Sequence, residues 1–117
     1  MAVKAYQKAQ LAAENPRNTE YRLFGQVTGA LIDAQAANAK GVALMEAIDW
    51  NRRLWSTLAV DCMGDGNQLS KPLRAQIVSL SLWVTKYSSQ VMTNGASLEP
   101  LIDVNRTIMQ GLQPAPA

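Results

Sequence analysis

The residues of this chain whose types best indicate a function lie in one short segment, and the function they indicate is binding to a partner. The segment reads Asp49-Trp50-Asn51-Arg52-Arg53-Leu54-Trp55, and it holds two of the three tryptophans of a chain that is 6% aromatic. Tryptophan and arginine are enriched among the residues that dominate binding energy at protein interfaces. The segment therefore indicates a contact with a partner, although two tryptophans buried in a helical core would give the same composition.

Helical geometry separates the two tryptophans of this segment. Each residue of an α-helix turns by ~100°, so Trp50 and Trp55, five positions apart, point in directions about 140° apart. One flat core face could hardly bury both rings, which favours a helix that packs on two sides. Trp55 is aligned with Leu58 and Cys62, so we expect Trp55 in the core. Trp50, beside Arg53, is the ring that we expect to reach a partner.

Other candidate binding residues lie further along the chain. Trp83 belongs to a run, residues 77–84, that is apolar around most of its circumference. This run predicts a central, wholly buried helix, and the alternative is a neighbouring groove that accepts an amphipathic helix. Asn105 falls on the apolar side of a helical segment, where its amide needs a hydrogen-bond partner in the protein or in a ligand. The full set of candidate partner-binding residues is Trp50, Arg52, Arg53, Trp55, Trp83, Asn105, Arg106 and Met109.

Catalytic and metal-binding chemistry has little support in the sequence. The chain contains no histidine, which removes histidine-based acid–base catalysis and histidine metal ligands. It also lacks a phosphate-binding glycine loop and a nucleophile elbow. We therefore predict no enzymatic activity, no metal site and no cofactor.

Charge and cysteine usage restrict the partners and the compartment. Eleven basic and nine acidic residues give a net charge of +2, without any Lys/Arg run longer than a pair. This balance disfavours direct nucleic-acid binding and electrostatic anchoring to a membrane. Cys62 is the only cysteine, so the chain resembles one from a reducing compartment. Because there is no signal-like apolar run at the start and no ~20-residue apolar stretch, we expect a cytoplasmic protein.

Helices must position these side chains, because apolar residues recur at spacings of three and four. We expect a weak helix over residues 3–13, and a second helix that begins at Asn15 or Asn18 and ends around residues 38–41, where Gly41 can adopt the left-handed C-terminal conformation. A third covers residues 42–63, either continuous or broken at Asp49. Two more begin at caps provided by Ser70 and Ser97 and end near Asn94-Gly95 and Gly111.

The connections between these segments are short, which favours antiparallel neighbours. Residues 64–67 (Gly-Asp-Gly-Asn) form the strongest turn signal, and residues 113–117 should be a disordered tail. The sequence therefore predicts an all-α protein, a small antiparallel bundle of four to five helices, with residues 1–112 forming a single domain.

Four stretches, in order along nearly the whole chain, resemble the FlaF family of flagellar biosynthesis regulators of alphaproteobacteria. They are Pro16-Arg17-Asn18-Thr19-Glu20-Tyr21-Arg22-Leu23-Phe24, Asp49-Trp50-Asn51-Arg52-Arg53-Leu54-Trp55, Ser81-Leu82-Trp83-Val84 and Leu101-Ile102-Asp103-Val104-Asn105-Arg106-Thr107-Ile108-Met109-Gln110-Gly111-Leu112. The resemblance implies a small cytoplasmic protein that binds flagellin and supports its synthesis or export alongside the regulator FlbT. It implies no enzymatic activity, no cofactor and no residue-level map of the binding site.

Two hypotheses about function follow from the resemblance together with the residues. The first is a chaperone whose groove covers a terminal amphipathic helix of flagellin. Trp50, Trp55 and Trp83 would anchor that helix, and Arg52, Arg53 and Arg106 would guide it. The alternative is a post-transcriptional regulator of flagellin expression that acts through a protein partner or RNA.

Overall fold

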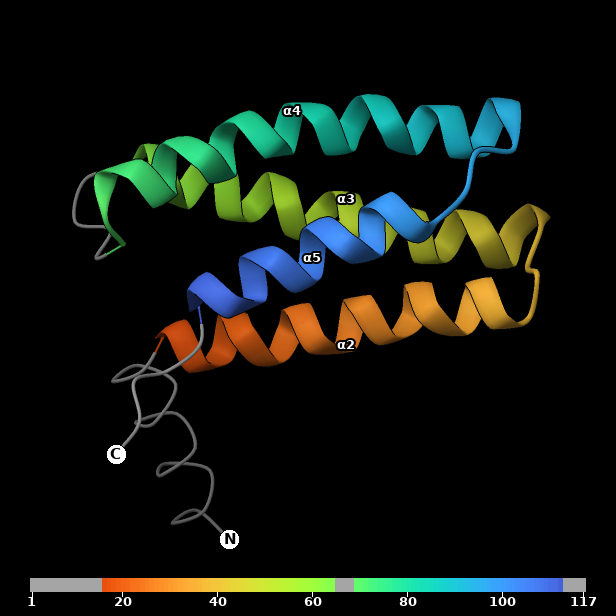
Figure 1. Ribbon diagram of the computed structural model, residues 1–117, viewed down its shortest axis with the longest axis horizontal. Coiled ribbons are helices and arrows are strands. Elements are labelled where there is room, and N and C mark those ends of the chain that lie inside the picture. The colour runs from red at the N-terminus through yellow and green to blue at the C-terminus, as the bar shows by residue number, and fades with distance from the viewer. Residues whose placement is uncertain (1–15, 65–68, 113–117) are drawn as a thin grey trace, which may run out of the picture.

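The computed structural model describes residues 16–64 and 69–112, and in these ranges it contains helices and no strand. The helices are α2 (Pro16–Ala36), α3 (Gly41–Met63), α4 (Lys71–Asn94) and α5 (Glu99–Leu112). Successive helices run in opposite directions, so the predicted all-α antiparallel bundle is confirmed for this part of the chain (Figure 1). The expected helix over residues 3–13, the cap at Asn15, most of the 64–67 turn and the 113–117 tail lie outside the described residues.

The helices form a ring in which α2 and α3, α3 and α4, α4 and α5, and α5 and α2 are neighbours (Figure 1). The pairs α2–α4 and α3–α5 lie diagonally across the ring. The backbones of α4 and α5 come close to each other at fewer positions than those of any other neighbouring pair, whereas α5 lies closely along α2. One edge of the bundle, between α4 and α5, is therefore loosely closed.

The end of α2 differs from the prediction. Asn38, with φ of +50°, takes the left-handed position after the helix. Its N–H donates to the carbonyl of Gln35 at 3.1 Å, and the N–H of Ala39 donates to the carbonyl of Ala34 at 2.9 Å. This pair of bonds is the usual pattern at a helix C-terminus that ends on a left-handed residue. Gly41 is also left-handed, as expected, with φ of +62°, but it begins α3, so the expectation that Gly41 provides the left-handed residue at the end of α2 is wrong.

The predicted ends of α4 and the beginning of α5 are confirmed. Ser70 caps α4, because its Oγ accepts a hydrogen bond from the N–H of Leu73 at 3.3 Å. Gly95 follows α4 in the left-handed conformation, with φ of +68°. Ser97 Oγ accepts from the N–H of Glu99 at 3.1 Å and so satisfies one of the free donors at the start of α5.

The core runs the length of the bundle between the four helices. α4 contributes a seam of Ile77, Val84 and Val91, all buried. The rest of α4 is less enclosed than predicted, since Leu82 is 67% exposed and Trp83 only half-buried. The prediction of a wholly buried helix is therefore wrong, because α4 packs closely on α3 alone. The largest fully buried side chains are Trp55, Phe24, Leu31, Ile48, Ile77, Leu101, Ile102, Ile108, Val27, Val84 and Asn51.

None of the four helices combines the length and the apolar character that crossing a lipid bilayer requires.

Candidate binding surfaces

Trp55 lies inside the bundle, where α3 faces α2 and α5. Its side chain is 1% exposed, and its ring meets that of Phe24 edge to face, with ring centroids 5.5 Å apart. The indole Nε1 donates a hydrogen bond to Asn105 Oδ1 at 2.8 Å. Such an arrangement satisfies both the apolar ring and its polar N–H. The expectation that Trp55 belongs to the core is confirmed.

Asn105 is the centre of a buried polar cluster that joins three helices. Besides accepting from Trp55 on α3, its Nδ2 donates to Asn51 Oδ1 at 2.8 Å and to Thr28 Oγ1, on α2, at 3.1 Å. Asn105 itself is 0% exposed. The hydrogen-bond partners that the Asn105 amide was expected to need are thus provided by other helices of the bundle. Neither Asn105 nor Trp55 has surface to offer a partner, although both were candidate binding residues.

Met109 also packs inward against α2. The Thr28 hydroxyl donates to Met109 Sδ at 3.9 Å, and the methyl group of Met109 lies against Gly25. Met109 is half-buried and extends the polar cluster towards the C-terminal end of α5. The cluster therefore fixes α5 on α2, away from α4.

Trp50 lies on a different face of the unbroken helix α3 and is 40% exposed. It lines an open groove between α2 and α3 with a volume of about 410 Å³. The floor of this groove is made largely of small side chains, and two carboxylates belong to its lining. The lining residues are Ala30, Asp33, Ala34, Ala37, Ala39, Ala43, Glu46, Ala47 and Trp50.

The candidate arginines occupy outward faces of the bundle. Arg53 donates from Nε and Nη2 to Asp49 Oδ2, at 2.9 and 2.6 Å, one helical turn away. Its side chain is 77% exposed, so this pair is a surface ion pair. Arg52 is half-buried and adjoins the same shallow hollow on α3. Arg106 is exposed on α5.

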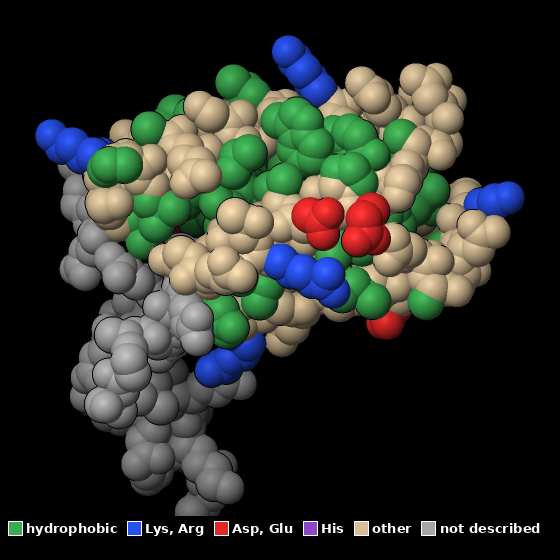
Figure 2. All heavy atoms as spheres, in the orientation of Figure 1, with side chains coloured by type: hydrophobic (Ala, Val, Ile, Leu, Met, Phe, Trp, Pro, Cys, Tyr) green, Lys and Arg blue, Asp and Glu red, His purple; other side chains and the backbone are tan. Residues whose placement is uncertain are grey.

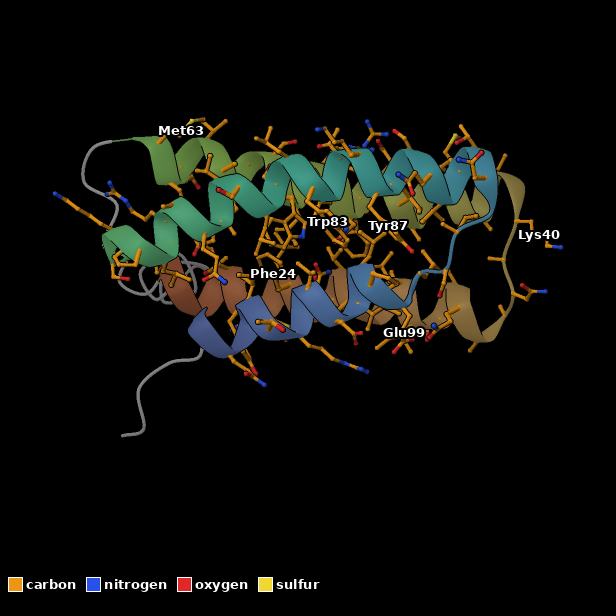
Figure 3. All side chains as sticks on the ribbon, turned by 45° about the horizontal axis from the view of Figure 1, so that its top comes forward. Phe24, Lys40, Met63, Trp83, Tyr87 and Glu99 are labelled. Carbon is orange, nitrogen blue, oxygen red and sulfur yellow. The ribbon has the colours of Figure 1, made fainter. Side chains whose placement is uncertain are left out.

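Trp83 forms part of an aromatic pair at the α4–α5 edge. Its ring stacks on that of Tyr87, with centroids 5.0 Å apart and planes 15° apart. The Tyr87 hydroxyl donates to the carbonyl of Ser97 at 2.6 Å. Figure 3 shows both rings in the space between α4 and α5. Sequence reasoning missed this pair, although the i, i+4 spacing of the two aromatic residues on one helix was a usable signal.

A comparison of the whole chain with family models matches residues 2–112 to the family described as flagellar protein FlaF. The chain belongs to the FlaF family. The resemblance inferred from the sequence motifs is thereby confirmed, and the chain is a flagellar protein involved in flagellum biogenesis. Searches of curated proteins and of solved structures gave no match.

In this FlaF-family protein the candidates that reach the surface do not converge on one site. Trp50 lies at the α2–α3 edge and Trp83 at the α4–α5 edge, which are opposite sides of the ring. Arg52 and Arg53 lie on the outside of α3. In this chain the segment from Asp49 to Trp55 thus places one indole ring in the core and the other at the surface.

Cys62, also on α3, is buried and lies with the core residues. Burial raises the pKa of its thiol above the ordinary value, and the nearby carboxylates of Glu20 and Asp61 raise it further, while Arg74 acts in the opposite direction. Because the thiolate is the reactive form, a raised pKa keeps this thiol protonated and unreactive near neutral pH. This environment is that of a buried structural thiol.

Proposed function

We propose that this FlaF-family protein is a flagellin-binding chaperone that covers the apolar face of a terminal flagellin helix before export. The observation that carries the proposal is Trp50. A tryptophan that remains 40% exposed beside a groove, in a bundle whose core is filled without it, is typical of an interface anchor.

The shape of the α2–α3 groove supports a helix as the ligand. Alanine side chains along its floor let a second helix come close, because the distance between packed helices depends on the side chains at their contact. Trp50 would then pack against the apolar face of the incoming helix. This is the mode in which amphipathic helices bind hydrophobic grooves.

The charges of the groove indicate which helix would fit. Asp33 and Glu46 are exposed in its lining, and neither forms an ion pair within residues 16–64 and 69–112. A ligand helix with lysine or arginine beside its apolar face would complement them. Since such a helix orders as it binds, part of the binding energy is spent on ordering, and release at the export apparatus becomes easier.

The proposal is tested by titrating flagellin, with and without its terminal helices, against three forms of this protein. We expect the wild type to bind full-length flagellin and to lose binding when the helices are removed. Trp50→Ala should weaken binding by about tenfold or more, as expected for an anchor residue. Val60→Ala, at an apolar position of α3 that is more exposed than Trp50, at 63%, is the control and should bind like the wild type.

Two outcomes would contradict the proposal. Equal binding of truncated and full-length flagellin would exclude the helix-in-groove mode, and equal effects of Trp50→Ala and Val60→Ala would place any binding site elsewhere. Tight, salt-sensitive binding to flagellin leader RNA would instead favour the regulatory alternative.

A further inference from the structure

α5 differs from the other three helices in its length and in its amphipathic character. It spans 14 residues, against 21 to 24 for the others, and it separates apolar from polar residues more sharply than they do. Glu99, Asp103 and Arg106 are exposed on its outer side, and Figure 2 shows charged side chains of both signs on this side of the molecule. A helix of this length is only marginally stable alone, so α5 depends on its packing against the bundle.

The inward face of α5 has a polar side chain at the centre of an apolar patch. Asn105 lies three or four positions from each of four apolar residues of α5, so that all five share one face of the helix. The four apolar residues are Leu101, Ile102, Ile108 and Met109. The centre of the patch is thus an amide that is 0% exposed, and its burial is favourable only where its hydrogen bonds are made.

The polar cluster beneath α5 is incompletely satisfied. Asn105 bonds to Trp55, Asn51 and Thr28, but Asn51 Nδ2, buried in the same cluster, has no hydrogen-bond partner within the described residues. The Thr28 hydroxyl donates to the thioether sulfur of Met109 at 3.9 Å, and such a sulfur is a weak acceptor. Water would solvate these groups if α5 moved away. Separation of α5 is therefore less unfavourable than separation of a wholly apolar interface of the same size.

The other three helices remain in contact with one another when α5 is away. α3 packs along both α2 and α4, whereas α5 packs mainly along α2 and comes close to α4 at few positions. Residues 95–98 join α4 to α5, and they begin with Gly95, whose backbone has the freedom that a hinge requires. An element with few neighbours and a flexible connection is the kind that opens locally while the rest of a protein stays folded.

From these features we propose that α5 is a displaceable occupant of the apolar surface formed by α2, α3 and α4, and that it opens as a unit while those helices stay folded. The open state presents the Trp55 ring, the Asn51 amide and the Thr28 hydroxyl, which Asn105 covers in the closed state. The partner that fits this surface is an amphipathic helix with a carboxamide at the centre of its apolar face, because α5 itself binds in that way. The opening does not depend on flagellin binding beside Trp50.

Amide hydrogen exchange of the full chain, followed by NMR, tests the opening. We expect amides of residues 105–109 in α5 to exchange about tenfold or more faster than those of residues 24–28 in α2, after correction for intrinsic rates. Val78→Ala weakens the packing of α4 on the side away from α5, because Val78 and Tyr87 are nine positions, or about 180°, apart on the helix. This variant should accelerate exchange in α2 and leave exchange in α5 unchanged. Equal exchange in the two helices, or acceleration in both by Val78→Ala, would overturn the proposal.

A fluorescently labelled peptide of residues 97–112, which is the α5 sequence itself, tests whether the uncovered surface accepts a helix. Fluorescence anisotropy measures its binding to the full-length protein. It should bind Ile102→Ala protein about tenfold or more tightly than wild-type protein, because a weakened internal α5 leaves the surface open for more of the time. Ile102 is 1% exposed. Gln110→Ala, at an exposed position of the same helix, is the matched control and should bind the peptide like the wild type.

A second peptide tests the role of the central amide. The Asn105→Leu peptide should bind Ile102→Ala protein about tenfold more weakly than the unchanged peptide, because the Trp55 N–H and the Asn51 side-chain carbonyl then lack a partner. Circular dichroism shows whether Ile102→Ala protein is folded, and if it is not, the exchange comparison decides the proposal. Equal peptide binding by folded Ile102→Ala and wild-type protein, or equal binding of the two peptides, would overturn it.

Discussion

Trp50 and Trp55 lie five residues apart on α3, yet one is 40% exposed at a groove and the other is 1% exposed in the core. The inner face of α3 presents Trp55 to Phe24 and to the amide of Asn105. The outer face presents a surface ion pair of Asp49 and Arg53. Residues on the inner face of α3 thus stabilise the fold, whereas residues on its outer face are free to bind. The orientation of the helix about its own axis determines which residues lie on each face.

The two faces of α3 also differ in whether their contacts are made within the protein or with solvent. On the inner face every contact of Trp55 is made within the protein, including the hydrogen bond of its N–H. On the outer face the surface of Trp50 and its two neighbouring carboxylates, Asp33 and Glu46, are left in contact with solvent. Changes to the inner face should therefore alter stability, and changes to the outer face should alter binding.

The largest expected effect is that of Trp55→Ala. Removing this buried ring should lower the free energy of unfolding by about 3–5 kcal/mol, because it leaves a cavity against Phe24. Urea unfolding followed by far-ultraviolet circular dichroism measures this change. Trp50→Ala is the matched control on the same helix and should cost less than about 1 kcal/mol. If the two variants lost similar stability, the division of α3 into a structural and a binding face would be wrong.

A smaller loss is expected for Asn105→Leu, which conserves volume and removes the centre of the polar cluster. The indole N–H of Trp55 and the side-chain carbonyl of Asn51 would lose their hydrogen-bond partner and Thr28 Oγ1 would lose a donor, so we expect the free energy of unfolding to fall by about 2–3 kcal/mol. Trp55→Phe removes the same hydrogen bond from the other side. A double-mutant cycle of the two should show coupling of about 1 kcal/mol or more, since both delete one interaction. Additive losses would mean that the bond between Trp55 and Asn105 contributes little.

Much of this architecture could be predicted from local signals. The spacing of apolar residues predicted the helices, and Ser70 and Gly95 marked the ends of α4 because their preferences act within one turn. The alignment of Trp55 with Leu58 and Cys62 predicted its burial. The left-handed residue after α2 was assigned to Gly41 instead of Asn38, because both adopt left-handed conformations and local preference alone does not rank them.

The candidate binding surfaces were harder to predict from the sequence because they depend on how the helices pack together. The sequence showed that Asn105 needs a hydrogen-bond partner, but its partners come from α2 and α3, 50 or more residues away along the chain. The exposure of Trp83 follows from the position of α5, which lies closely on α2 and leaves the flank of α4 open. No pattern within residues 77–84 carries that information, so the sequence predicted a wholly buried helix there.

The smallest effect is expected on the outer face, for the ion pair of Asp49 and Arg53. Both side chains are largely in solvent, and an i, i+4 pair of this kind contributes about 0.3–0.5 kcal/mol. Arg53→Ala should therefore lower the free energy of unfolding by less than about 1 kcal/mol, and the difference from wild type should shrink further at 1 M salt, where exposed charges are screened. Urea unfolding of Arg53→Ala and Asp49→Asn at low and high salt measures both effects. A salt-independent loss as large as that of Asn105→Leu would show that Arg53 supports the fold, and the contrast between the two faces of α3 would then hold for the tryptophans alone.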